Sequence, residues 1–249
     1  MLETSLDIPE RRAAFARMLD IYETTDPPGT VLHDLVMLYG KKKSFAWQPQ
    51  PPEDITMTNH LLGVGLSVPV QHPNYADLGA SIDHALAAGV PFVELPLQSL
   101  DLIVGARLLR HRVAEVASIV ADRPARTTLH GHLGINLMEE LHLIGLHLDV
   151  LKANIEVAQA LGSIHLVIHS GFTRPLQHAA IERAYDRQRE ALASIAGMAA
   201  DAGVVVCVEC IFTYDTARHH PLPSRLAAEL GLIDHPSIRA TFDFSHGYI

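Results

Sequence analysis

The sequence is poor in cysteine and has no long apolar run. Its two cysteines, Cys207 and Cys210, fall three residues apart in one predicted strand, so their side chains point to opposite faces and geometry disfavours a disulfide between them. No apolar run reaches the ~18 residues that a membrane span needs. Residues 1–7 lack the basic start and apolar centre of a signal peptide. These absences predict a cytoplasmic protein with no membrane association.

Basic residues are also scarce. The chain has 19 lysines and arginines against 28 aspartates and glutamates, which gives a formal net charge of −9. A protein whose main partner is DNA needs a basic field to offset phosphate repulsion, so this balance argues against a nucleic-acid partner. Apolar residues, in contrast, fill 48% of the 249 positions against 19% for charged residues, which is enough for a substantial core.

The first 58 residues differ in pattern from the rest of the chain. The pattern predicts an amphipathic helix over residues 9–22 and a shorter helix over 30–39, separated by Pro27–Gly29 and followed by a proline-rich linker at 48–53. We therefore predict that residues 1–58 form an N-terminal helical extension and linker, and that residues 59–249 form a separate domain.

Beyond the linker, short apolar strands alternate with helices, several of which end on a glycine. The predicted strands lie at 61–68, 91–97, 126–132, 164–169 and 204–211, with a sixth that ends near Asp243. The predicted helices lie at about 75–88, 100–121, 181–202 and 224–230, with a further one that ends at 162. Short apolar strands that alternate with helices indicate βα units and a parallel sheet.

Polar residues stand at the C-terminal end of nearly every predicted strand, namely Glu94, His130, His132, His169, Glu209, Asp243 and His246. In an open, doubly wound sheet the site gathers at one switch point and draws on few strands. In a (β/α) barrel all strand ends surround a single mouth. No glycine-rich phosphate fingerprint follows the first strand, which weakens the dinucleotide-binding alternative. The predicted fold is therefore an α/β, TIM-type barrel that is incomplete after its sixth strand.

Two acidic residues at these strand ends indicate a metal or proton-transfer site. Glu209 lies in the apolar run 204–211, and burying a carboxylate is costly unless a partner compensates its charge. Asp243 makes the same case, with His246 three residues later. Carboxylate and imidazole ligands without thiolate suit manganese, zinc, magnesium or iron. A single strand histidine is more often hydrogen-bonded than a ligand, so the interpretation rests on the whole set.

Taken in order, these segments resemble the xylose-isomerase-like barrel superfamily, which contains sugar (phosphate) isomerases and epimerases and the apurinic-site endonucleases. The resemblance runs from about residue 61 to 249. The matching segments are Phe92-Val-Glu-Leu95 on the second strand, Leu129–Leu137 on the third, Val167–Gly171 on the fourth, Val208-Glu209 on the fifth and Asp243-Phe-Ser-His246 on the sixth. Each match is short, but their common order and spacing point to the superfamily.

The resemblance implies a divalent-metal-dependent isomerase or epimerase that acts on a small carbohydrate or polyol. In that chemistry a metal polarises neighbouring oxygens while a carboxylate moves a proton. The implied metal ligands are Glu209 and Asp243, and the implied catalytic residues are Glu209 and His246. The implied substrate contacts are Glu94, His130, His169 and His246.

The sequence also departs from the family, which takes a histidine ligand from strand seven and a glutamate ligand from strand eight. The chain ends at Ile249, after strand six. It is expected to be a fragment of a longer protein, to be completed by a second chain or a symmetric partner, or to be a non-catalytic relative, and the fragment is favoured. Enzymatic activity is expected where the missing strands are supplied.

Two other functions stay open on the residues alone. One is a metal-dependent phosphodiesterase of the apurinic-site endonuclease type, whose ligand positions match His130, His169, Glu209, Asp243 and His246. The acidic net charge counts against it. The other is a non-catalytic binding module that keeps the barrel wall without holding a metal.

Overall fold

The computed structural model describes residues 36–37, 63–174, 176–211, 217–243 and 246, which belong to one compact unit. The helix predicted at 9–22, most of the one predicted at 30–39, and the linker at 48–53 lie outside these residues. The domain boundary near residue 58 also lies outside them and stays a prediction.

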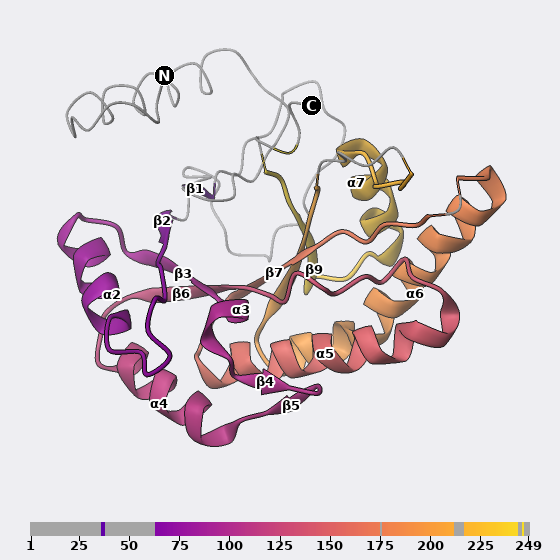
Figure 1. The fold of residues 1–249 in the computed structure, drawn as a ribbon. Coiled ribbons are helices and arrows are strands. Elements are labelled where there is room, and N and C mark those ends of the chain that lie inside the picture. The colour runs from indigo at the N-terminus through magenta and orange to yellow at the C-terminus, as the bar shows by residue number, and fades with distance from the viewer. Residues whose placement is uncertain (1–35, 38–62, 175, 212–216, 244–245, 247–249) are drawn as a thin grey trace, which may run out of the picture. The chain divides into compact units, whose positions relative to one another are not determined.

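Within this unit, short strands alternate with helices along the chain (Figure 1). The strands are β1 (Val36–Met37), β2 (Gly63–Ser67), β3 (Phe92–Pro96), β4 (Ile103–Val104), β5 (Arg107–Leu108), β6 (Arg126–His130), β7 (His165–His169), β8 (Val205–Glu209) and β9 (Ile238–Thr241). The helices are α2 (Leu78–Ala87), α3 (Leu97–Leu100), α4 (Arg110–Ala121), α5 (Leu141–Ala160), α6 (His178–Asp201) and α7 (Pro223–Ile233).

The main sheet has the strand order β1-β2-β3-β6-β7-β8-β9. Each pair from β2 to β9 is parallel, and β1 joins β2 in the antiparallel sense. The parallel strands follow one another in chain order, each reached through a helix, as in a (β/α) barrel. Among the described residues β9 pairs with β8 alone, so the part of the barrel seen here is open on that side.

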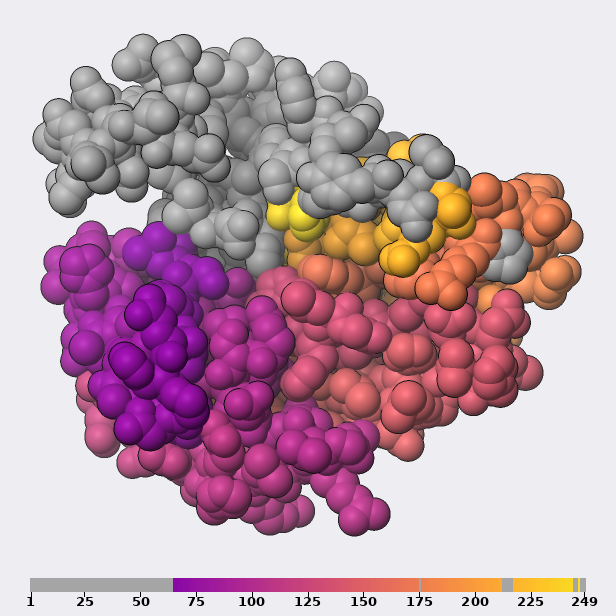
Figure 2. Space-filling model, in the orientation of Figure 1, coloured from indigo at the N-terminus to yellow at the C-terminus, as the bar shows by residue number. Residues whose placement is uncertain are grey.

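The two faces of the sheet differ in chemistry, and this difference supports a barrel wall over a doubly wound sheet. Val93, Leu129, Leu166, Ile168 and Val208 belong to one buried apolar cluster with residues of the helices. The alternate strand residues point to the opposite face. A doubly wound sheet would carry helices on both faces and would be apolar on both. Figure 1 shows α2, α4, α5, α6 and α7 following the outer side of the strands, and in Figure 2 α2, α4, α5 and α6 form much of the described surface toward the viewer.

Glycines end three of the helices as the sequence predicts. Gly89, Gly162 and Gly203 follow α2, α5 and α6 with φ values of +78°, +63° and +69°. Only glycine adopts this left-handed conformation without a steric cost, so each residue turns the chain toward the next strand.

The structure corrects two sequence predictions. The helix predicted over 100–121 begins only at Arg110, because residues 103–108 form the β4–β5 hairpin. Gly105 and Ala106 both have positive φ, +57° and +60°, which is the geometry of a two-residue hairpin turn. Figure 2 shows this turn projecting from the surface. Val36–Met37, within the predicted helix 30–39, form strand β1.

No helix of the described residues is long and apolar enough to cross a lipid bilayer.

Candidate active site

The C-terminal ends of four neighbouring strands bring most of the predicted site residues to one face of the sheet. His169 and Glu209 are register partners in the β7–β8 ladder, and Glu209 is in turn the partner of Thr241 on β9. His130 ends β6. Because residues in register point to the same face, the imidazole of His169 and the carboxylate of Glu209 meet on the inner side of the barrel wall.

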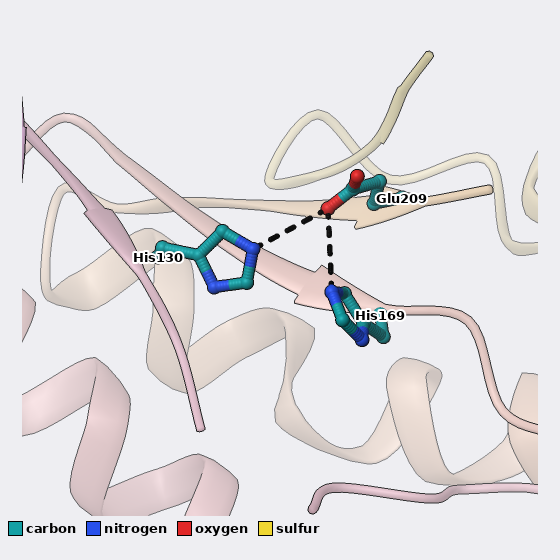
Figure 3. Close-up of side chains that lie close together, drawn as sticks. All are labelled: His130, His169 and Glu209. Carbon is teal, nitrogen blue, oxygen red and sulfur yellow. Dashed lines mark ion pairs between the residues drawn. The ribbon is translucent and has the colours of Figure 1, made fainter. Parts of the chain in front are cut away.

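Glu209 lies at the centre of the cluster, with an exposed fraction of 1%. Its Oε2 lies 3.5 Å from His130 Nε2 and 3.7 Å from His169 Nε2. Figure 3 shows the two imidazoles approaching this oxygen from β6 and β7. The two rings are nearly perpendicular, at 89°, with centroids 5.2 Å apart. The other oxygen, Oε1, lies 3.2 Å from His246 Nδ1.

Asp243 and His246 lie close together just after β9. The backbone N–H of His246 donates to Asp243 Oδ1 over 3.3 Å, and His246 Nδ1 lies 3.5 Å from Asp243 Oδ2. The Asp243 carboxylate is buried, with 4% exposure. A second carboxylate and an imidazole therefore lie together at the end of β9, with His246 Nδ1 beside Glu209 Oε1.

The spacing of these atoms fits a metal ion better than direct ion pairs. Charge-assisted hydrogen bonds are about 2.7–2.9 Å long. The Nε2 atoms of His130 and His169 lie 3.5 Å and 3.7 Å from Glu209 Oε2. Two atoms that each lie about 2.1 Å from one ion in tetrahedral geometry are about 3.4 Å apart. Two groups have all their ligand atoms within 4.8 Å of one another, namely His130–His169–Glu209 and Glu209–Asp243–His246.

Hydrogen bonds to backbone carbonyls assign the proton on two of the rings. His130 Nδ1 lies 3.1 Å from the carbonyl of Gly131, and His246 Nδ1 lies 3.0 Å from the carbonyl of Cys210. A carbonyl can only accept, so both Nδ1 atoms carry hydrogen and the lone pairs sit on Nε2. His130 thus turns a ligand atom toward Glu209. His246 turns an N–H toward the carboxylates and carries its lone pair on Nε2.

The two cysteines are poor metal ligands. They point to opposite faces of β8, as predicted: Cys210 packs in the apolar cluster with the helices, whereas Cys207 is the register partner of Arg239. Burial raises the pKa of the Cys207 thiol to about 12 and also raises the pKa of Cys210. Because the thiolate is the ligand form, the donor set of the site consists of oxygen and nitrogen atoms.

A cavity of about 290 Å³ opens over this cluster, and it is lined by Ser67, Glu94, Pro96, Gln98, His130, Leu133, His169, Glu209, Asp243 and His246. The lining includes all six residues to which the sequence analysis gave a catalytic, ligand or substrate role. It also includes Ser67, Pro96, Gln98 and Leu133, which the sequence analysis missed. Ser67 and Pro96 end strands, so position alone could have identified these two. His132 turns away to Asn154 and does not line the cavity.

Comparisons with known proteins agree with this fold. The model of the xylose isomerase-like TIM barrel family matches residues 82–249. No curated protein matches the chain. Among solved structures, a D-allulose 3-epimerase from Methylomonas sp. is 19% identical with a TM-score of 0.59, over 74% of this chain and 64% of that one.

Two further solved structures are similar to the same extent. A D-psicose 3-epimerase from Clostridium cellulolyticum H10 is 14% identical with a TM-score of 0.58, over 74% of this chain and 64% of that one. An L-ribulose 3-epimerase is 15% identical with a TM-score of 0.57, over 73% of this chain and 60% of that one. The chain thus spans less than two thirds of the length of these neighbours, and at these identities the likeness shows the fold alone.

Proposed function

The chain belongs to the xylose isomerase-like TIM barrel family, and on that basis we propose that it is a divalent-metal-dependent isomerase or epimerase of a small sugar. The observation that carries the proposal is the buried carboxylate of Glu209. One of its oxygens lies near the imidazoles of His130 and His169, and the other lies near His246. A carboxylate so placed can both hold a cation and exchange a proton.

Glu209 and Asp243 are the proposed ligands of the metal, and oxygen donors of this kind suit manganese, magnesium, zinc or iron. When bound, such an ion polarises adjacent carbonyl and hydroxyl oxygens of a sugar. Glu209 is the proposed base that takes up the proton from the carbon beside the carbonyl. Inversion is complete when a second acid returns a proton to the opposite face of that carbon, a role that the resemblance to the family assigns to the glutamate of strand eight.

His246 is the proposed partner of the reacting hydroxyl. Its Nδ1–H is directed to the Cys210 carbonyl and the neighbouring carboxylates, so its Nε2 can accept a hydrogen bond from a substrate hydroxyl. His130, His169 and Glu94 line the same cavity and would orient the remaining hydroxyl groups. Placing several groups around one small substrate contributes to catalysis by fixing its orientation.

The lining of the cavity favours a neutral sugar over a sugar phosphate. The described lining carries three carboxylates, Glu94, Glu209 and Asp243, and no lysine or arginine. An anionic phosphate is best held by arginine, lysine or a helix N-terminus. The solved neighbours include proteins named as acting on D-psicose, D-allulose and L-ribulose. We therefore propose free ketoses as the substrate class.

The test is an epimerisation assay on the purified chain loaded with Mn²⁺. D-fructose, D-tagatose and L-ribulose are each incubated with the protein, and the products are separated by chromatography. A new C3 epimer that forms with wild-type protein and is reduced about 10²- to 10⁴-fold in Glu209→Gln supports the proposal. Turnover that is unchanged in Glu209→Gln would contradict the role of Glu209. Turnover of a sugar phosphate but of no free ketose would contradict the substrate class.

One observation favours a second candidate function, metal-dependent phosphodiester hydrolysis. His130 and His169 form a separate donor group on the Oε2 side of Glu209, while Asp243 and His246 lie on the Oε1 side. A carboxylate between two donor groups can bridge two ions, an arrangement used by phosphodiesterases. Nicking of a duplex that contains an abasic site, with no turnover of ketoses, would favour this alternative. The acidic net charge of −9 counts against it.

A further inference from the structure

A fully buried amide on a helix that carries none of the site residues contacts the turn beside His130. Asn154 is on α5, has an exposed fraction of 0%, and is surrounded along the helix by the buried residues Leu151, Ala153, Ile155 and Val157. A polar amide in such surroundings is costly unless it is hydrogen-bonded, and an apolar residue would pack there without that cost. Its hydrogen-bond partners therefore indicate its role.

The orientation of the Asn154 amide is set by its partners. Nδ2 donates to the Val150 carbonyl over 2.6 Å, which places the oxygen on the opposite side. Oδ1 accepts the backbone N–H of His132 over 3.0 Å and lies 3.2 Å from His132 Nδ1. The amide thus holds both the backbone and the ring of His132, two residues after His130.

The backbone at Gly131, which lies between His130 and the His132 N–H bound by Asn154, has little room to move. The N–H of Gly131 donates to Val167 on β7 over 2.7 Å. A Cβ at Gly131 would lie 2.9 Å from that carbonyl oxygen and 3.0 Å from Asn154 Oδ1, which is closer than side-chain carbons approach such atoms. The Gly131 carbonyl is the group that accepts from His130 Nδ1.

We propose that Asn154 is a positioning residue that, through the Gly131–His132 peptide, fixes the His130 ring as its Nδ1–H tautomer and directs Nε2 toward Glu209. Hydrogen bonds to the far nitrogen of a ligand histidine set its tautomer and orientation, and they change metal affinity when they are removed. Asn154 does not contact the His130 ring itself. It binds the N–H of the Gly131–His132 peptide, and the carbonyl of the same peptide accepts from His130 Nδ1. The inference rests on the proposed function only in giving His130 a ligand or substrate role.

The test compares Asn154→Leu with Asn154→Asp. Leucine has a similar size and packs in the same apolar site but cannot accept from His132, whereas aspartate keeps an oxygen at that position. The first readout is the ¹⁵N spectrum of the histidine rings without metal, with the His130 signals assigned by their loss in His130→Gln. We expect the Nδ1–H tautomer in wild type and in Asn154→Asp, and a mixture of tautomers in Asn154→Leu.

The second readout is the affinity for Zn²⁺ by calorimetry. His130, His169 and Glu209 can form one donor group for Zn²⁺. With His130 as one of the donors, we expect Asn154→Leu to weaken the affinity about 10- to 100-fold, the usual effect of removing an outer hydrogen-bond partner, and Asn154→Asp to keep most of it. The control is Thr127→Val, which removes the buried hydrogen bond from Thr127 on β6 to Ser163 without touching the turn at Gly131. It should leave both readouts unchanged.

If Asn154→Leu does not fold, Gly131→Ala tests the same turn from the other side, because the added methyl group displaces the peptide from Val167 and Asn154. An unchanged His130 tautomer in a folded Asn154→Leu or Gly131→Ala variant would overturn the inference. A chain that binds no Zn²⁺ but shows the expected tautomer change would contradict the proposed metal site and leave the positioning role supported.

Discussion

Glu209 and Glu229 are both buried glutamates, with exposed fractions of 1% and 5%, but they lie among different kinds of neighbours. Glu229, on α7, is paired with the guanidinium groups of Arg189 and Arg225, the latter at 2.7 Å. Glu209, at the end of β8, has the imidazoles of His130, His169 and His246 at 3.2–3.7 Å. A glutamate is thus buried among arginines in the helix layer and among histidines at the strand ends.

This difference separates a structural carboxylate from a reactive one. A guanidinium stays charged at every physiological pH and forms hydrogen bonds of fixed geometry, so the charge of Glu229 is neutralised within the fold. Arg225 also lies over the ring of Tyr185, at 4.2 Å from its centroid, and pairs with Glu182 at 2.7 Å. An imidazole can lose its proton and bind a metal through the same nitrogen. The histidines around Glu209 can therefore become metal ligands, whereas the arginines around Glu229 cannot.

The largest expected difference between the two glutamates is in metal content. We expect the purified wild-type chain to carry about one divalent ion and the Glu209→Ala/Asp243→Ala double variant to carry none, because both proposed carboxylate ligands are lost. The Glu229→Gln variant is the matched control and should keep its metal. Elemental analysis measures all three proteins. Equal metal content in wild type and double variant would place the ion elsewhere, and a metal-free wild type would favour the non-catalytic binding module.

For the stability of the fold, we expect the substitution of Glu229 to have a larger effect than that of Glu209. Glu229→Gln leaves Arg189 and Arg225 without their shared partner and should lower the free energy of unfolding by about 2 kcal/mol, between the values for surface and for buried ion pairs. Glu209→Gln should cost less in the metal-free protein, since it removes one of two neighbouring buried carboxylates that repel each other. Urea unfolding of both variants in the presence of a chelator provides the comparison. A larger loss in Glu209→Gln would mean that Glu209 is as structural as Glu229.

The sequence predicts the parallel sheet and the ends of its strands because both depend on local features. Buried strands read as apolar runs, and a glycine with positive φ marks the end of α2, α5 and α6. The first polar residue after such a run must lie at the mouth of the barrel. This argument locates His169 and Glu209 without any knowledge of their neighbours.

The errors arise where a short segment satisfies two patterns. Ile103 and Val104 fit an apolar helix face as well as a strand, and only the positive φ of Gly105 and Ala106 distinguishes the hairpin. Val36–Met37 become a strand by pairing with β2, a partner that lies far along the chain. Asn154 could not be predicted because its partner also lies elsewhere in the chain. An asparagine within an apolar helix does not indicate which backbone group it will bind, here the N–H of His132.

The smallest expected effect concerns a third buried group, His165, at the opposite end of β7 from His169. Burial lowers its pKa, and the charge of Arg126 lowers it further. The unfolded chain therefore binds a proton at His165 at pH values where the folded chain does not, so stability falls as the pH drops below about 6.5 toward the lower pKa of the folded state. One such group contributes at most about 1.4 kcal/mol per pH unit.

We expect His165→Gln to flatten the slope of unfolding free energy against pH between 7 and 5, with the exposed His178→Gln as the control for removing a histidine. An equal slope in wild type and His165→Gln would show that His165 is protonated alike in the folded and unfolded states, against the effect expected from its burial.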